Sequence, residues 1–341
     1  MRIALDAMGG DHAPAATVEG AVEACSQNSQ LSVILVGNET AIASELKKHK
    51  YSASQLRVKH ASQTVEMDDS PMSALRRKKD SSIRIATDLL KSDDADGMVS
   101  AGNSGVVMAT ALLVLGKLSG VERPAIATVM PSLKGHFILI DAGANVDCKP
   151  VHLFQFGLMG EAYSRYIFNI ENPKVGMLSI GEEDAKGNEL TKESFKLLKN
   201  AGLNFIGNVE GRHIFEGDAD VVVCDGFVGN IALKIAEGFA ETTAKMLKRE
   251  IVEKTAGEIG SDFLKKALSN FQKKTDYSEY GGAPLLGLNK PCIISHGRST
   301  SKAIKNAVIL AGMLHSKGIL QIISKECKEG LAGRETVFIE E

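Results

Sequence analysis

Short apolar runs alternate with polar, glycine-rich turns and helical patterns along most of the chain. Residues 2–7 (RIALDA) and 31–37 (LSVILVG) predict two strands that flank a helix from about Ala15 to Cys25. The same order of strand, turn and helix recurs in the segments 99–110, 139–150, 175–190, 221–236 and 293–307. Because strands that alternate with helices form parallel sheets, the pattern predicts an α/β protein with a mostly parallel sheet.

The turns that follow these strands hold the residues expected to carry chemistry. The turn in residues 175–189 (VGMLSIGEEDAKGNE) combines glycines with mixed charges, and neither residue type helps to build an apolar core. In a parallel sheet the carboxyl ends of the strands open onto one crevice, so we expect several such turns to converge on one site. Their composition fits an anionic, oxygen-rich ligand, of which phosphate is the obvious example.

The SAGNSG turn at residues 100–105 is the first candidate for phosphate binding. It offers backbone N–H groups at a helix N-terminus, where the helix dipole favours an anion. It also offers the side chains or backbone of Ser100, Gly102, Asn103 and Ser104. Serine and asparagine cap helices for purely structural reasons as well, and this alternative stays open.

Polar residues in the other turns extend the candidate site. A lysine and an asparagine from separate strand ends could hold an oxyanion together, which points to Lys186 and Asn230 as the catalytic pair. Ordinary helix capping by Asn230 and an exposed Lys186 are the alternative. His296 follows an apolar strand and could be an acid, a ligand or a buried structural histidine. The candidates for substrate binding in these turns are Asp141, Asn145, Asp184, Asn188, Asp225 and His296.

Other chemistries are less well supported. Glu182, Glu183 and Asp184 carry the oxygen ligands that a divalent metal prefers, but Lys186 would compete for their charge, so we expect no metal. No histidine lies at a spacing that ties it to Cys148, which favours a packed cysteine over a nucleophilic thiolate. The turn MGGDHAP after the first strand lacks the GxGxxG spacing of a dinucleotide site.

Bulk composition limits the class of protein. The 341 residues are 44% hydrophobic and 24% charged, and the formal net charge of -2 gives no reason to expect a nucleic-acid partner. The five cysteines contain no CxxC pair, which fits a reducing cytosol better than a disulfide framework. The longest apolar run, Val106 to Leu115, is too short to span a bilayer. We expect a single catalytic α/β unit over residues 1–341, or two interleaved subdomains around a cleft.

Residues 237–274 predict long helices that project from this unit, with breaks at Gly257 and Gly260. On a helical wheel one face of residues 259–271 is apolar and the other carries lysines. The apolar face predicts either core or dimer packing, or an interfacial helix that rests on anionic lipid.

Several long strings go beyond generic spacing. They are LDAMGGDHAP, VSAGNSG, DAGANVDCKP, LSIGEEDAKGN, CDGFVGN and EYGGAPLLGLN, with a late HG, in order from Leu5 to Gly297. Together they closely resemble the bacterial phosphate acyltransferase family (PlsX) over nearly the whole chain. The resemblance implies a homodimer with a three-layer α/β/α Rossmann-like sandwich, related to phosphate acetyltransferases and isocitrate-type dehydrogenases, and it implies no organic cofactor.

The resemblance also implies an activity and a partner. Enzymes of this family convert fatty acyl-[acyl carrier protein] and inorganic phosphate to acyl phosphate and free acyl carrier protein, an early step of bacterial phospholipid synthesis. A membrane glycerol-phosphate acyltransferase then uses the product. The resemblance therefore implies a cytoplasmic location, and peripheral attachment at the inner face of the cell membrane is a further expectation. Lys186 and Asn230 match the residues most directly at the reacting centre, and the SAGNSG turn matches part of the phosphate pocket.

The chain departs from the family's motifs at two places, and three alternative functions remain. The late motif reads HGRST where many relatives have HGSS, and His213 stands where an acidic residue is common, which leaves the roles of Arg298 and Arg212 open. The alternative functions are a short-chain acyltransferase that uses coenzyme A, an isocitrate-type dehydrogenase and a noncatalytic scaffold at the membrane.

Overall fold

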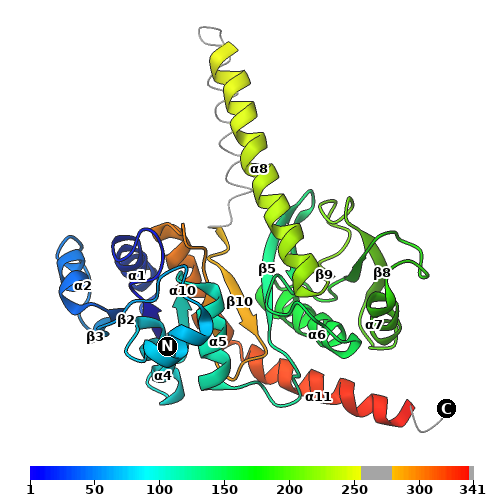
Figure 1. The fold of residues 1–341 in the computed structure, drawn as a ribbon, viewed down its shortest axis with the longest axis horizontal. Coiled ribbons are helices and arrows are strands. Elements are labelled where there is room, and N and C mark those ends of the chain that lie inside the picture. The colour runs from blue at the N-terminus through cyan, green and yellow to red at the C-terminus, as the bar shows by residue number, and fades with distance from the viewer. Residues whose placement is uncertain (255–278, 338–341) are drawn as a thin grey trace.

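The computed structural model describes residues 1–254 and 279–337, which form one 11-stranded sheet with helices on both faces (Figure 1). The strand order is β3-β2-β1-β4-β11-β10-β5-β6-β9-β7-β8. The mostly parallel sheet expected from the sequence is therefore confirmed. Parallel pairing joins two blocks of strands, and two antiparallel strands lie between the blocks.

The first block consists of the N-terminal third of the chain and two elements from near the C-terminus. Its parallel strands are β1 (Arg2–Asp6), β2 (Ser32–Gly37), β3 (Leu56–His60), β4 (Gly97–Ser100) and β11 (Cys292–Ile294). Its helices are α1 (Ala15–Gln27), α2 (Glu39–Leu46), α3 (Pro71–Arg77), α4 (Ser82–Lys91), α5 (Ser104–Leu115) and α10 (Ser301–Ser316). Side chains alternate along β1, so Ile3 and Leu5 pack in the same apolar cluster as residues of α1 and α10, whereas Ala4 packs with residues of α4 and α5.

The second block repeats this layering. Its parallel strands are β6 (Gly135–Ile140), β7 (Val175–Ser179), β8 (Phe205–Glu210) and β9 (Val221–Val223). Its helices are α6 (Pro150–Ile167), α7 (Glu189–Lys199), α8 (Gly226–Lys254) and α11 (Ile319–Val337). Ile138 and Ile140 of β6 share a cluster with α6, whereas Phe137 and Leu139 share one with Leu233 of α8.

The strands β10 (Ala283–Leu286) and β5 (Ala125–Ser132) join the two blocks. The pairs β11–β10, β10–β5 and β5–β6 are all antiparallel, so the parallel strands of the second block run opposite to those of the first. The sheet is therefore not parallel throughout, and the carboxyl ends of the two blocks point in opposite directions along it. Pairing partners far apart in the sequence decide strand direction, and local patterns do not report it.

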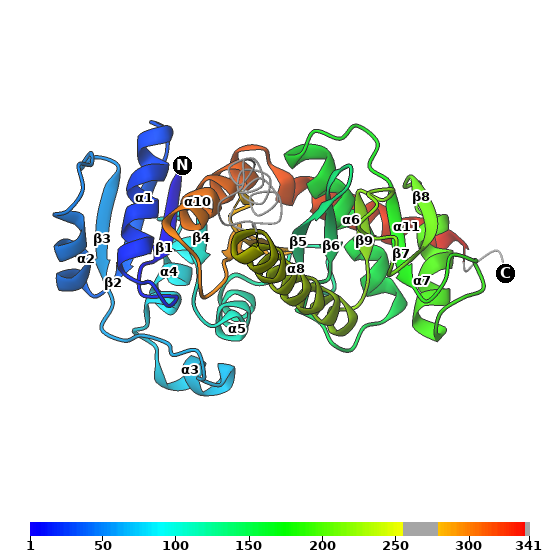
Figure 2. The same cartoon turned by 90° about the horizontal axis from the view of Figure 1, so that it is seen from above.

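Helix α8 leaves the body of the molecule and projects outward (Figure 1). The predicted helical projection is thus observed as far as Lys254, although the helix begins earlier than expected, at Gly226. Figure 2 shows the same helix from above. The predicted breaks and the amphipathic face of 259–271 lie outside the described residues. Among the helices that the structure describes, none is by itself long and apolar enough to cross a bilayer; α10 and α11 meet that test only as a pair bent by 57°.

Candidate active site

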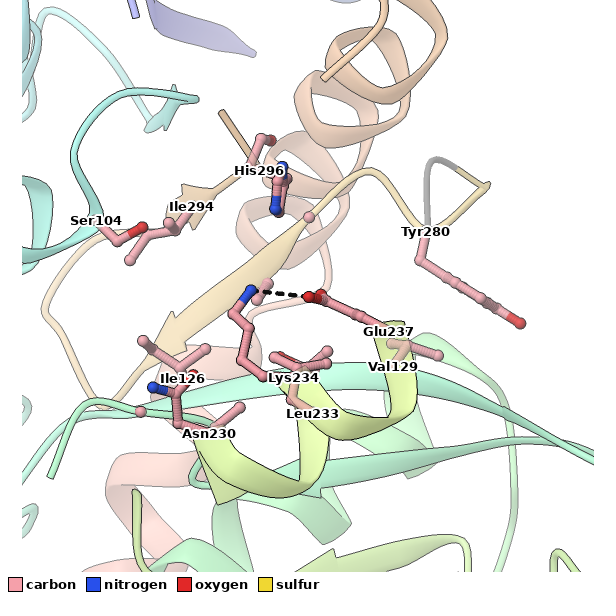
Figure 3. Close-up of a pocket in the computed structure, with 16 residues that line it drawn as sticks. Ser104, Ile126, Val129, Asn230, Leu233, Lys234, Glu237, Tyr280, Ile294 and His296 are labelled. Atoms are coloured by element: carbon pink, nitrogen blue, oxygen red, sulfur yellow. Dashed lines mark hydrogen bonds and ion pairs between the residues drawn. The ribbon is translucent and has the colours of Figure 1, made fainter. Parts of the chain in front are cut away.

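A cavity of about 340 Å³ opens near the centre of the sheet, where β10 and β5 separate (Figure 3). These strands pair only through Leu285 with Ile126 and Leu286 with Ala125. Ala283 of β10 and Thr128 of β5 lie beyond the paired residues and line the cavity. The polar lining consists of Ser104, Thr128, Asn230, Lys234, Glu237, Ser295 and His296, and the larger apolar lining residues are Ile126, Val129, Leu233, Tyr280 and Ile294.

The start of α8 is fixed against the turn after β6. A Cβ at Gly226 would lie 2.7 Å from the backbone nitrogen and oxygen of Asn145, and one at Gly229 would overlap the carbonyl oxygen of Asp141. Only glycine at these two positions lets the start of α8 lie so close to the backbone of this turn. This approach places Asn230 over Gly143, whose added Cβ would lie 3.5 Å from the Asn230 Cβ, and so brings the Asn230 amide into the cavity.

The SAGNSG turn contributes Ser104 to the cavity and uses its other polar groups internally. The Ser100 hydroxyl donates to Asp6 Oδ2 at 2.6 Å, and it accepts the Gly102 N–H at 3.1 Å. Asn103 caps α5 by accepting the Val106 N–H, and its amide donates to the carbonyl oxygens of residues 66, 67 and 69. Ser100, Gly102 and Asn103 therefore shape the turn, while Ser104 is the side chain that faces the ligand space.

Asp141 and Asn145 organise the turn after β6. Asp141 is buried and accepts the backbone N–H groups of Ile126, Gly143, Ala144 and Asn145, as well as the Asn145 side-chain amide. Burial raises the pKa of Asp141, and these hydrogen bonds act against that rise. Neither side chain lines the cavity, whereas Ala142 and Gly143 between them do.

The turn after β7 lies outside the cavity lining. Asp184 forms an exposed ion pair with Lys199 at 3.1 Å, and Asn188 caps α7 by accepting the Thr191 N–H. Lys186 is exposed and does not line the cavity. Asp225, in the turn after β9, accepts the N–H groups of residues 227 and 228 at the start of α8. The structure thus brings Ser104, Asn230 and His296 together and places Lys186 on a separate turn.

His296 lines the cavity at the end of β11. Its Nδ1 accepts the Arg298 backbone N–H at 3.1 Å, so in the neutral ring the proton is on Nε2. Burial lowers the pKa of His296, and Lys234 lowers it further, while Glu237 opposes the change. A neutral His296 can donate one hydrogen bond to an anion through Nε2.

Lys234 and Glu237 were not among the site residues expected from the sequence. With Asn230 and Leu233 they occupy positions i, i+3, i+4 and i+7 of one helix, so a single face of α8 points into the cavity. The helical pattern in 221–236 contained this signal, because extending the helix from Asn230 identifies both residues.

The cysteines do not offer a nucleophile at this site. Burial, with a contribution from Asp141, raises the pKa of Cys148 to about 12. Burial also raises the pKa of Cys224, which is fully enclosed behind the turn after β6. Both thiols are protonated near neutral pH, which agrees with the expectation of packed cysteines.

The cavity combines two chemical characters. One ammonium, two hydroxyl groups of serine, an amide and a histidine can hold a small anion, while the isoleucine, valine and leucine side chains can hold an apolar group beside it. No group of His, Cys, Asp and Glu within residues 1–254 and 279–337 has the arrangement of a metal site.

Comparisons with known proteins agree with this combination. The family profile described as "Fatty acid synthesis protein" matches residues 1–322. A phosphate acyltransferase of Thermodesulfovibrio yellowstonii is 56% identical over 96% of this chain and 95% of its own length. One from Geobacter sulfurreducens is 52% identical over 96% of this chain and 94% of its own.

Solved structures share the fold. A phosphotransacetylase from Streptococcus pyogenes has a TM-score of 0.60 at 20% identity, covering 91% of this chain and 93% of its own. The EutD phosphotransacetylase from Staphylococcus aureus has a TM-score of 0.58 at 19% identity, covering 92% and 94%. At these identities the likeness concerns the fold alone. The sequence matches show that the chain is a transferase and belongs to the fatty acid synthesis protein family that includes the phosphate acyltransferases.

Proposed function

We propose that this protein transfers a long-chain fatty acyl group from acyl carrier protein to inorganic phosphate. The products are acyl phosphate and free acyl carrier protein, and the reaction serves phospholipid synthesis. The observation that carries the proposal is the cavity itself, in which Asn230, Lys234 and His296 face apolar side chains. A phosphate nucleophile and a fatty thioester need polar and apolar surfaces side by side.

The reaction requires no acyl-enzyme. A phosphate oxygen attacks the thioester carbonyl, the C–S bond breaks, and the proton of monohydrogen phosphate passes to the departing thiolate. Positioning of the two substrates and stabilisation of the developing oxyanion supply the acceleration. We assign the oxyanion to the Asn230 amide together with Lys186, whose turn would have to close over the bound substrate to reach it.

The direct test uses palmitoyl-[acyl carrier protein], inorganic phosphate and hydroxylamine, which traps acyl phosphate as a hydroxamate. We expect hydroxamate only when phosphate is present. Acetyl- and butyryl-coenzyme A in place of the carrier substrate test the short-chain alternative, and faster turnover with them would replace the proposed donor. Absence of product with every donor, together with sedimentation on anionic liposomes, would favour the scaffold.

We also propose that the active form is a homodimer that pairs through α8. Exposed apolar side chains recur at helical spacing along this helix, including Ile231, Ile235, Phe239 and Met246, and Phe239 is 72% exposed. A second copy of the helix would bury this stripe. Attachment to a membrane surface, close to the acyltransferase that uses the product, is a further proposal and concerns the amphipathic pattern of 259–271.

Replacing Phe239 by glutamate should convert the dimer to a monomer, because it places a charge in the apolar interface. Light scattering measures the molar mass. Lys192→Glu, at an exposed position on α7, is the matched control and should leave the mass unchanged. A wild-type protein that is monomeric at micromolar concentration would exclude the dimer.

A further inference from the structure

The cavity contains one ion pair that the proposed reaction does not yet use. Lys234 Nζ lies 2.8 Å from Glu237 Oε2, and both side chains reach from α8 toward the centre of the cavity, opposite Ser104 and His296 (Figure 3). Among the lining residues that the structure describes, Lys234 is the one ammonium or guanidinium group and Glu237 the one carboxylate. A phosphate in this cavity must therefore meet Lys234 with Glu237 already beside it.

The acidic residues of the turns after β6 and β9 are engaged elsewhere. Asp141 accepts hydrogen bonds from the turn that it organises, and Asp225 caps α8. Asn230 lies one helical turn before Lys234 on the same face, so the amide and the ammonium point into the same space. A tetrahedral anion held by Lys234 would lie next to the group assigned to the oxyanion.

We propose that Lys234 anchors the phosphate nucleophile and that Glu237 is an internal anion that phosphate displaces from it. This inference rests on the proposed function. Without substrate the pair is neutral, and a dianion is attracted to the ammonium more strongly than a single carboxylate is. After acyl transfer, return of Glu237 to Lys234 promotes release of the charged product.

A second ion pair on α8 lies outside the cavity and provides a comparison for the pair between Lys234 and Glu237. Lys245 Nζ lies 2.8 Å from Glu241 Oε1, but neither residue lines the cavity. The Lys234 and Glu237 side chains are 55% and 33% exposed, against 74% and 50% for Lys245 and Glu241. Surface pairs of this kind contribute little to stability, so loss of either pair should leave the fold intact.

The experiment compares Lys234→Ala, Lys234→Gln and Glu237→Gln with the controls Lys245→Ala and Glu241→Gln. Calorimetric titration with inorganic phosphate alone measures binding, and the assay with palmitoyl-[acyl carrier protein] measures the KM for phosphate. Both Lys234 variants should weaken phosphate binding about tenfold or more, the loss expected for a charge-assisted hydrogen bond. Glu237→Gln should strengthen binding, because the competing carboxylate is gone, and the controls should match the wild type.

The outcomes separate this inference from the proposed function. If wild-type protein forms acyl phosphate but the Lys234 variants bind phosphate as tightly as the controls, Lys234 is not the anchor. Weaker phosphate binding in Glu237→Gln would overturn the displacement role and make Glu237 a support for Lys234. If wild-type protein forms no acyl phosphate from any donor, the proposed function fails, whatever the phosphate titrations give.

Discussion

Replacing Asn230 by alanine should lower kcat by about 100-fold or more, the usual loss when one oxyanion donor is removed. The change deletes an amide that lines the cavity and leaves the glycines that seat α8 in place. Asn230→Asp is a sharper version, because it keeps the size of the side chain but removes its N–H donors. Turnover of palmitoyl-[acyl carrier protein] at saturating phosphate measures the effect.

Asn38→Ala is the matched control for this prediction. Asn38 caps α2 by accepting the Ala41 N–H and does not line the cavity, so its loss should cost about 1 kcal/mol of stability and leave kcat nearly unchanged. Lys186→Ala tests the second member of the proposed pair, and we expect it to lower kcat as well. Near-normal turnover in Asn230→Ala would remove the amide from the mechanism, and the same result in Lys186→Ala would show that its turn stays away from the reaction.

Replacing Gly229 by alanine should separate the start of α8 from the turn after β6. The new methyl group would overlap the Asp141 carbonyl oxygen and crowd Cys224 Sγ, which lies 2.9 Å from the Cβ position. Overpacking of this kind costs about 1–3 kcal/mol, and more when backbone must move. Because Asn230 and Lys234 follow on the same helix, we expect a large loss of turnover along with the loss of stability.

Gly238 provides the control on the same helix. Apart from its chain neighbours and the backbone of its own helix, nothing lies within 4 Å of the position that its Cβ would occupy, so Gly238→Ala meets no obstacle. Alanine in an exposed helix interior is favoured over glycine by about 0.5–1 kcal/mol, and this variant should therefore be slightly stabilised. Urea unfolding of both variants and their turnover provide the measurement. Equal stability of the Gly229→Ala and Gly238→Ala variants would mean that the start of α8 does not pack against the Asp141 carbonyl oxygen as described.

Strands and helices were predictable wherever local pattern determines them. The first strand was expected at 2–7 and lies at Arg2–Asp6, and the first helix was expected from Ala15 to Cys25 and ends at Gln27. The reversal between the two parallel blocks was not predictable, because it depends on β10 pairing with β5, more than 150 residues earlier in the chain.

The candidate site was predicted at the level of turns and less well at the level of side chains. Of the residues chosen, Ser104, Asn230 and His296 line the cavity, whereas Ser100, Asn103 and Asp225 bond to the backbone or to Asp6. Small polar residues at strand ends serve ligands and helix caps equally well, so residue type alone does not separate the two uses. Lys234 escaped notice because it lies inside a helix and not in a turn.

The weak join between β10 and β5 has a consequence for the range of substrates. Two residue pairs connect these strands, and the cavity begins where their pairing stops. Separating the strands at this seam would break few backbone hydrogen bonds. One apolar cluster continues across the seam, with Ile304 of α10 and Ile138 of β6 among its members, so this shared core and not the strand pairing limits how far the two blocks can separate for a bulkier guest.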